Sequence, residues 1–174
     1  MAGGLPIRPR TIAIDTNIFL VLLSYHSLKS EVVSAADRER RLVEVRGRDD
    51  KVSLDQFDAL WRIFARAERR IVTQHVVAEA FSNKMRRRSN WSSAIELLPK
   101  YDMEERGCCI RDLYAQAEFR RIVEEIGPTD AGLIYTAGTE KATIITEDRR
   151  LRQWAEVRSV PALALNQLEC LQLR

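Results

Sequence analysis

Hydrophobic residues in this chain fall into short runs that alternate with longer amphipathic segments. Residues 11–15 (TIAID) and 142–148 (ATIITED) are rich in β-branched side chains, which favours short buried strands. A third brief strand is predicted at residues 71–73, and a last one near residues 161–165. The segments between them have the spacing of apolar residues that is typical of helices. Strands that alternate with helices predict a parallel sheet covered on both faces.

The expected fold is therefore a three-layer α/β/α sandwich on a central, mostly parallel sheet of four to five strands. Residues 29–70 are highly charged and predict an extended helical region of two amphipathic helices between the first and second strands. The second of these helices has a capping-box pattern at its start, in Ser53 and Gln56. Residues 91–126 also have helical periodicity, in two segments separated near Gly107.

The length of 174 residues suits one domain, so we expect residues 1–174 to form a single unit. Within it, residues 29–70 would be a helical insertion or an extended helical hairpin. Apolar residues make up 45% and charged residues 30%, which excludes a disordered chain and a membrane protein. The first ten residues lack the apolar core of a secretory signal, which favours the cytoplasm.

The three cysteines do not have the spacing of a disulfide framework or of a zinc site. Cys108 and Cys109 are adjacent, and Cys170 stands alone near the end of the chain. We expect all three to be buried as small apolar residues.

Four acidic residues stand where strands end or helices begin. Asp15 and Asp148 follow predicted strands, Asp130 opens a helix, and Glu79 lies about two turns into the helix after the strand at 71–73. In an open parallel sheet the carboxyl ends of the strands and the starts of the following helices share one edge, where sites are found. We expect the four carboxylates to meet there.

A cluster of carboxylates is unfavourable by itself. Each like-charged pair at about 4 Å costs roughly 1 kcal/mol in water and about 4 kcal/mol at an effective dielectric of 20. A hard divalent cation, Mg²⁺ or Mn²⁺, removes this conflict because it prefers oxygen ligands. Such a cation also activates water and neutralises charge on phosphoryl oxygens. The acids therefore predict metal-dependent hydrolysis of a phosphodiester.

Each acid also has an ordinary structural interpretation, and these alternatives stay open. Asp15 and Asp148 are good helix caps, Asp130 suits the first turn of a helix, and Glu79 suits an exposed helix surface. Glu147 is either a solvated neighbour of Asp148 or an auxiliary ligand.

Four motifs, taken in order, resemble those of the PIN-domain ribonucleases, in particular the bacterial toxins of the VapC type. They are IDTN, the Glu of VVAEAF, PTDAGLI and TEDRRL, and together they cover most of the chain. The resemblance implies an endoribonuclease that uses Mg²⁺ or Mn²⁺. The implied catalytic metal ligands are Asp15, Glu79, Asp130 and Asp148, supported by Asn17 and Thr146. The chain departs from compact family members in the length of residues 29–70.

The resemblance also implies partners: an RNA substrate, a cognate antitoxin protein and a second copy in a homodimer, with no membrane. The basic run of Lys84, Arg86, Arg87 and Arg88 is a candidate RNA contact, or else a solvated helix end. The main alternative function is a catalytically silent PIN-like module that binds RNA or protein. A haloacid dehalogenase-type phosphatase is a weaker fit, since that chemistry needs an Asp where this chain has Asn17. A DNA-cutting nuclease of related fold is a further alternative.

Overall fold

Five parallel strands form the centre of the molecule. The computed structural model describes residues 9–30, 34, 36–37, 53–81, 96, 98–100, 102–107, 111 and 115–172. The strands run in the order β3-β2-β1-β4-β5, and every neighbouring pair is parallel. Their bounds are β1 Thr11–Ile14, β2 Arg69–Thr73, β3 Met103–Arg106, β4 Thr143–Ile145 and β5 Ala162–Leu163. The expected parallel sheet of four to five strands is confirmed.

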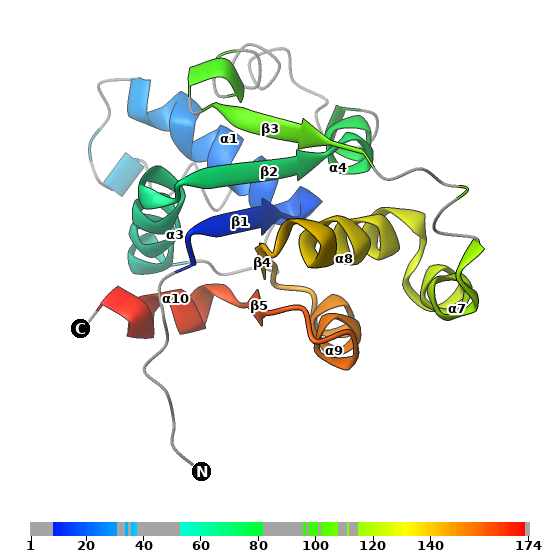
Figure 1. Cartoon of the computed structure of the whole chain (residues 1–174). Coiled ribbons are helices and arrows are strands. Elements are labelled where there is room, and N and C mark those ends of the chain that lie inside the picture. Colours follow the sequence, from blue (N-terminus) through cyan, green and yellow to red (C-terminus); the bar gives the residue numbers. More distant parts are fainter. Residues whose placement is uncertain are drawn as a thin grey trace.

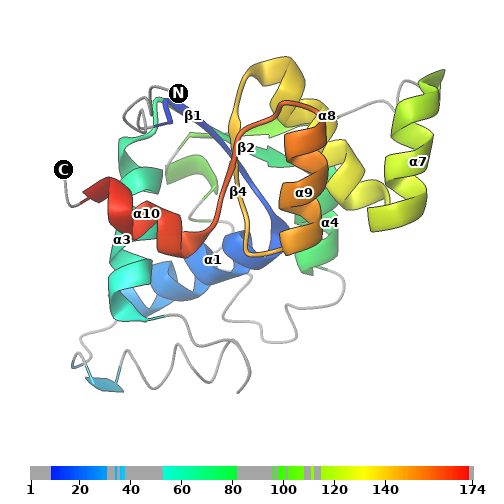
Figure 2. The same ribbon diagram turned by 90° about the horizontal axis from the view of Figure 1, so that it is seen from below.

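Helices cover both faces of this sheet (Figures 1 and 2). One face carries α1 (Thr16–Ser30), α3 (Leu54–Arg66), α4 (Gln74–Glu79) and α10 (Leu165–Gln172). The other face carries α7 (Ala117–Ile126), α8 (Pro128–Glu140) and α9 (Arg149–Val157). The predicted layering of helices on both sides of a sheet is therefore present.

Alternation along β1 explains why both faces are covered. Ile12 and Ile14 are buried in the cluster formed with α1 and α3, whereas Ala13 is buried in the cluster formed with α8 and α9. Successive side chains of a strand point to opposite faces, so a strand without polar positions needs a helical layer on each side. Burial of the Ile12 and Ile14 side chains stabilises the fold by roughly 1.5–3 kcal/mol each.

The second helix of the charged region, α3, forms as its sequence predicts. The Ser53 hydroxyl accepts a hydrogen bond from Gln56 N, and the Gln56 side chain accepts one from Ser53 N. At the other end, the Arg70 guanidinium donates to the carbonyls of Phe64 and Ala65, which the helix leaves unpaired. Most of the first predicted helix, after Ser30, lies outside the described residues.

Two elements differ from the predictions. Residues 103–106 form edge strand β3, although their sequence MEER was assigned to a helical segment. Glu and Arg are good helix formers, but pairing with β2 overrides this local preference. The second strand also begins at Arg69, so the predicted helical region at 29–70 extends too far. The last helix, α10, was not predicted.

An ion cluster ties β3 to the start of β2. Arg69 donates two hydrogen bonds to the Glu104 carboxylate, at 2.8 and 2.7 Å, and one to Glu140 at the end of α8, at 2.9 Å. Arg106 also contacts Glu104, at 2.6 Å. The hydrogen bonds from Arg69, and then from Arg106, lower the pKa of Glu104 to about 2. The cluster anchors a strand whose side chains are too polar to be held by burial.

The cysteine prediction is wrong for Cys170, which is exposed on α10. It lies on a helix surface turned toward solvent, and the neighbouring Leu168 fills the core in its place. Cys108 and Cys109 lie outside the described residues. In the described part of the chain, no helix has the length and apolar character needed to cross a membrane.

Candidate functional site

The carboxyl-terminal edge of the sheet places Asp15 between two threonines. The register pairs Ile14 with Val72 of β2 and with Ile145 of β4, so the next residue of each strand also lies side by side. Those next residues are Thr73, Asp15 and Thr146, which are 0%, 4% and 0% exposed. Backbone pairing continues beyond the strands, because Asp15 N donates to Ile145 O at 3.4 Å. Asp15 is thus a buried carboxylate at the centre of this edge.

Thr146 connects Asp15 to Asp148. Its hydroxyl donates to Asp15 Oδ2 and accepts a hydrogen bond of 3.0 Å from Asp148 N. Asp148 Oδ1 in turn accepts from Arg150 N and Leu151 N, at 2.7 and 3.1 Å. Its Oδ2 accepts no hydrogen bond within the described part of the chain, and Asp148 is exposed. One oxygen of this acid holds α9 in place, and the other faces solvent.

A second hydroxyl connects the site to Glu79. Thr16, the residue after Asp15, is 5% exposed, and its Oγ1 donates to Glu79 Oε2 at 2.9 Å. Glu79 is the last residue of α4, and the Thr73 hydroxyl caps the start of that helix by accepting a hydrogen bond from Val76 N. Two hydrogen-bonded groups therefore hold three of the four predicted acids: Thr146 joins Asp15 to Asp148, and Thr16, the residue after Asp15, holds Glu79.

Asp130, the fourth acid, reaches this edge from α8. Pro128 is at the start of that helix, and Gly127 before it has a φ of +88°, a conformation that suits glycine. Asp130 lies in the first turn and is half-buried. Figure 1 shows the start of α8 on the side to which the arrowheads of β1, β2 and β3 point, near α4. Asp130 in the first turn of α8 thus lies toward the predicted edge, where Thr146 joins Asp15 to Asp148 and Thr16 holds Glu79.

The donor chemistry suits a hard cation, although the acids are not drawn together as a finished cage. Within the described ranges, no three His, Cys, Asp or Glu side chains form a group that could hold a metal ion as they stand. Asp15, Glu79 and Asp148 each accept hydrogen bonds from hydroxyl or backbone N–H groups, which stabilise the charged carboxylate. All four offer the oxygen ligands that Mg²⁺ and Mn²⁺ prefer, and Mg²⁺ keeps several of its waters.

The capping interpretations of two acids are also correct, in part. Asp15 Oδ1 accepts from Asn17 N at 2.6 Å, which caps the start of α1, and Asp148 caps α9. Capping occupies one oxygen of each carboxylate. It orients the acid and leaves its second oxygen for Thr146 or for a ligand, so the structural and functional interpretations do not exclude each other.

The sequence did not indicate several contacts around these acids. Nothing in the sequence pattern pairs Thr16 with Glu79. Arg152 donates to the Thr146 carbonyl at 3.0 Å, and Glu147 accepts from Leu165 N at 2.6 Å at the start of α10. Glu147 is exposed, in line with its prediction as a solvated neighbour of Asp148, and its carboxylate also ties the turn before α9 to the start of α10. The apolar residues after PAL were the available signal for α10.

The remaining predicted residues have separate outcomes. The Thr146 hydroxyl donates a hydrogen bond to Asp15. Asn17 is exposed at the start of α1 and contributes its backbone N–H to Asp15. The basic run Lys84, Arg86, Arg87 and Arg88 lies outside the described residues.

Comparison with known proteins gives no family. No protein-family model matches the chain, and no curated protein matches it significantly. The function has to be argued from the site itself.

Proposed function

We propose that this chain is a metal-dependent endoribonuclease with a PIN-like fold. The parallel sheet order and the acids at its carboxyl-terminal edge agree with the resemblance seen in the four motifs. The toxin role in a toxin–antitoxin pair, the antitoxin partner and the homodimer rest on that resemblance alone. They belong to the same proposal.

The observation that carries the proposal is that two hydroxyls, of Thr16 and Thr146, hold Asp15, Glu79 and Asp148 at one edge of the sheet. Thr146 joins Asp15 to Asp148, and Thr16, which follows Asp15 in the chain, holds Glu79, although Glu79 stands 64 residues after Asp15 and 69 residues before Asp148. Asp15 is only 4% exposed, and burial of a carboxylate costs free energy of folding. A functional role for Asp15 accounts for a charge at this buried position. A neutral Ser or Asn caps a helix equally well, so capping alone does not require a carboxylate here.

Asp15, Asp130 and Asp148 would hold a Mg²⁺ or Mn²⁺ ion, directly or through water, and Glu79 would be a ligand or would orient the attacking water. A bound cation of this kind strengthens water as a nucleophile and neutralises charge on the phosphate. Thr146 holds Asp15 in one rotamer, and Thr16 does the same for Glu79. The caps of α1 and α9 keep Asp15 and Asp148 pointed toward the same edge.

The test is cleavage of mixed cellular RNA by the purified chain in Mn²⁺. The proposal expects cleavage by the wild type, with 5′-phosphate and 3′-hydroxyl ends, and a loss of at least about a hundredfold in Asp15→Asn or in EDTA. Glu105→Gln is the matched control, because Glu105 is an exposed acid on the outermost strand, β3. It should cleave at the wild-type rate.

Cleavage that persists in EDTA or in Asp15→Asn would reject the metal mechanism. A chain that binds RNA yet never cuts it, in any divalent metal, would favour the catalytically silent binding module. Cutting of single-stranded DNA at the same rate as RNA would replace the ribonuclease by a less selective nuclease.

A further inference from the structure

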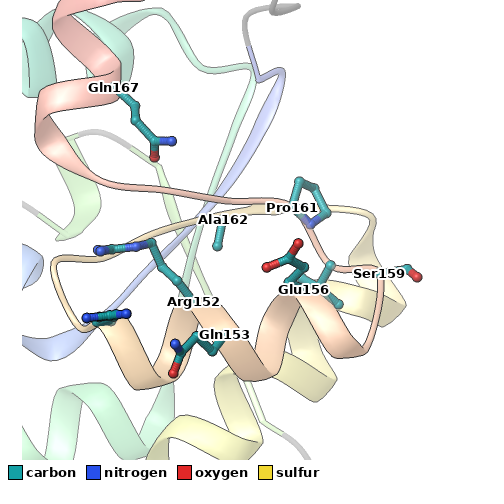
Figure 3. Close-up of a pocket in the computed structure, with 9 residues that line it drawn as sticks. Arg152, Gln153, Glu156, Ser159, Pro161, Ala162 and Gln167 are labelled. Atoms are coloured by element: carbon teal, nitrogen blue, oxygen red, sulfur yellow. The ribbon is translucent and has the colours of Figure 1, made fainter. Parts of the chain in front are cut away.

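A groove of about 500 Å³ opens between α9, β5 and α10, directly after Asp148. Figure 3 shows Gln167 reaching from α10 toward Ala162, with Arg152, Gln153 and Glu156 of α9 on the opposite side. Arg149 completes the lining at the start of α9. The floor is apolar, from Val160, Pro161 and Ala162. The size is in the range of sites for small molecules.

Charge is divided along the length of this groove. Arg149 and Arg152 lie in the first turn of α9, beside Asp148, whereas Glu156 lies near the last turn. At 1.5 Å per residue the two ends are about 10 Å apart along the helix. A ligand with an anionic end and a neutral polar end would fit in one direction only, with its anion toward the acidic site.

Most of the polar side chains in the groove have no partner among the residues that the structure describes. Arg149, Gln153, Glu156 and Ser159 make no side-chain hydrogen bond or ion pair in the part of the chain that the structure describes. Arg152 uses one nitrogen on the Thr146 carbonyl and is therefore held in place at the boundary with the site. Gln167 is likewise held, because its Oε1 accepts from Ala164 N at 2.8 Å.

We propose that the groove binds one unpaired nucleotide of single-stranded RNA, next to the phosphodiester that is cut. This inference rests on the proposed function for the position of the scissile bond. Arg149 and Arg152 contact the neighbouring phosphate, for which their planar forks are suited. Gln153, Gln167 and Glu156 meet the edge of the base, and Val160, Pro161 and Ala162 contact its flat face. A base inside a duplex would not present its edge in this way.

The test is binding of a short fluorescein-labelled oligouridylate by fluorescence anisotropy in EDTA, where cleavage by the proposed mechanism is absent. Arg149→Ala should weaken binding about tenfold, since it removes a charge-assisted contact. Gln153→Ala changes no charge and should weaken binding about threefold or more. Arg66→Ala is the matched control, an exposed arginine in the last turn of α3 that does not line the groove. It should stay within about twofold of the wild type.

Equal weakening in Arg149→Ala and Arg66→Ala, with none in Gln153→Ala, would mean that RNA is held only by general charge, and the groove proposal would be wrong. A wild type that binds no oligouridylate would overturn it as well. Thermal midpoints of all variants should agree, because these side chains are exposed.

The two proposals fail in different ways. If the wild type never cuts RNA in Mn²⁺ but Arg149→Ala and Gln153→Ala weaken binding, the groove stands as a site for single strands and the nuclease is rejected. If the wild type cuts and Asp15→Asn does not, yet both groove variants bind RNA normally, the nuclease stands and the groove is rejected.

Discussion

The hydroxyl of Thr146 donates a hydrogen bond to the buried carboxylate of Asp15, from the next strand of the sheet. The same hydroxyl accepts from the backbone N–H of Asp148. One small side chain thus positions an acid at the end of β1 and another at the start of α9. These two hydrogen bonds explain why threonine follows β4. Valine or isoleucine would suit the extended backbone equally well but has no hydroxyl.

Replacement of Thr146 by valine keeps the shape and removes both contacts. We expect a loss of about 1.5–3 kcal/mol in the free energy of unfolding, because a buried carboxylate loses a donor and a backbone N–H loses its acceptor. Thr143→Val on the same strand is the control, since the Thr143 hydroxyl makes no side-chain hydrogen bond within the described residues. Urea denaturation measures both. Equal effects of the two substitutions would contradict the role given to Thr146.

The contact between Thr16 and Glu79 predicts energetic coupling between α1 and α4. In a double-mutant cycle of Thr16→Val and Glu79→Ala, the coupling energy should be about 0.5–1.5 kcal/mol. Thr16→Ser retains the hydroxyl and should retain most of the coupling. A cycle in which the two single effects simply add would show that the hydrogen bond of 2.9 Å contributes nothing in solution.

Replacement of Gly127 should destabilise the protein because of its backbone conformation and not because of steric contacts. Its φ is +88°, and a Cβ built there meets nothing within 4 Å. Gly127→Ala should therefore destabilise the protein by about 1–3 kcal/mol through strain alone. Gly138, inside α8, is the contrast. A Cβ there reaches Val160 Cγ2 at 3.4 Å, an ordinary contact, so Gly138→Ala should stabilise by up to about 1 kcal/mol. Thermal unfolding that reverses this order would contradict the account of α8.

The low pKa of Glu104 makes part of the stability depend on pH. Hydrogen bonds from Arg69 and Arg106 hold that pKa at about 2, below the ordinary value of 4.5. A group with a depressed folded pKa stabilises the fold fully above its unfolded pKa, and this contribution declines as the pH falls from about 4.5 toward 2. The stability difference between the wild type and Glu104→Gln should thus be constant from neutral pH to about pH 5 and shrink below it.

Glu105→Gln is the control for that titration. Glu105 is the next residue of β3 and is exposed, and no ion pair involves it within the described ranges. Its substitution should change stability little at any pH. A difference between the wild type and Glu104→Gln that does not vary with pH would contradict the role of the ion cluster.

The fold was largely predictable because its central strands are apolar on both sides. Ile12 to Ile14 and Thr143 to Ile145 have that pattern, and only a parallel sheet between two helical layers buries it. The places of Asp15, Asp130 and Asp148 at strand ends and helix starts could be predicted together with the strands and helices themselves. Strand β3 could not be predicted in this way, because its Glu104 is held by Arg69, which lies 35 residues earlier in the sequence.

The details of the site were beyond the sequence for a similar reason. Thr16 and Glu79 are neighbours only after β2 has paired with β1, and Arg152 meets the Thr146 carbonyl only after α9 has folded back. Local patterns report which acids lie near an edge. They do not indicate which hydroxyl or carbonyl each side chain binds. They also do not indicate the groove beside α9.

Direct titration with Mn²⁺, without RNA, tests the central claim most closely. Free Mn²⁺ is followed by electron paramagnetic resonance as it is added to the wild type, Asp15→Asn, Asp148→Asn and Glu105→Gln. The account predicts saturable binding by the wild type and by Glu105→Gln, and binding weakened by about tenfold or more in Asp15→Asn and Asp148→Asn. A wild type that shows no saturable binding, or acids at the sheet edge whose removal leaves the affinity unchanged, would contradict it.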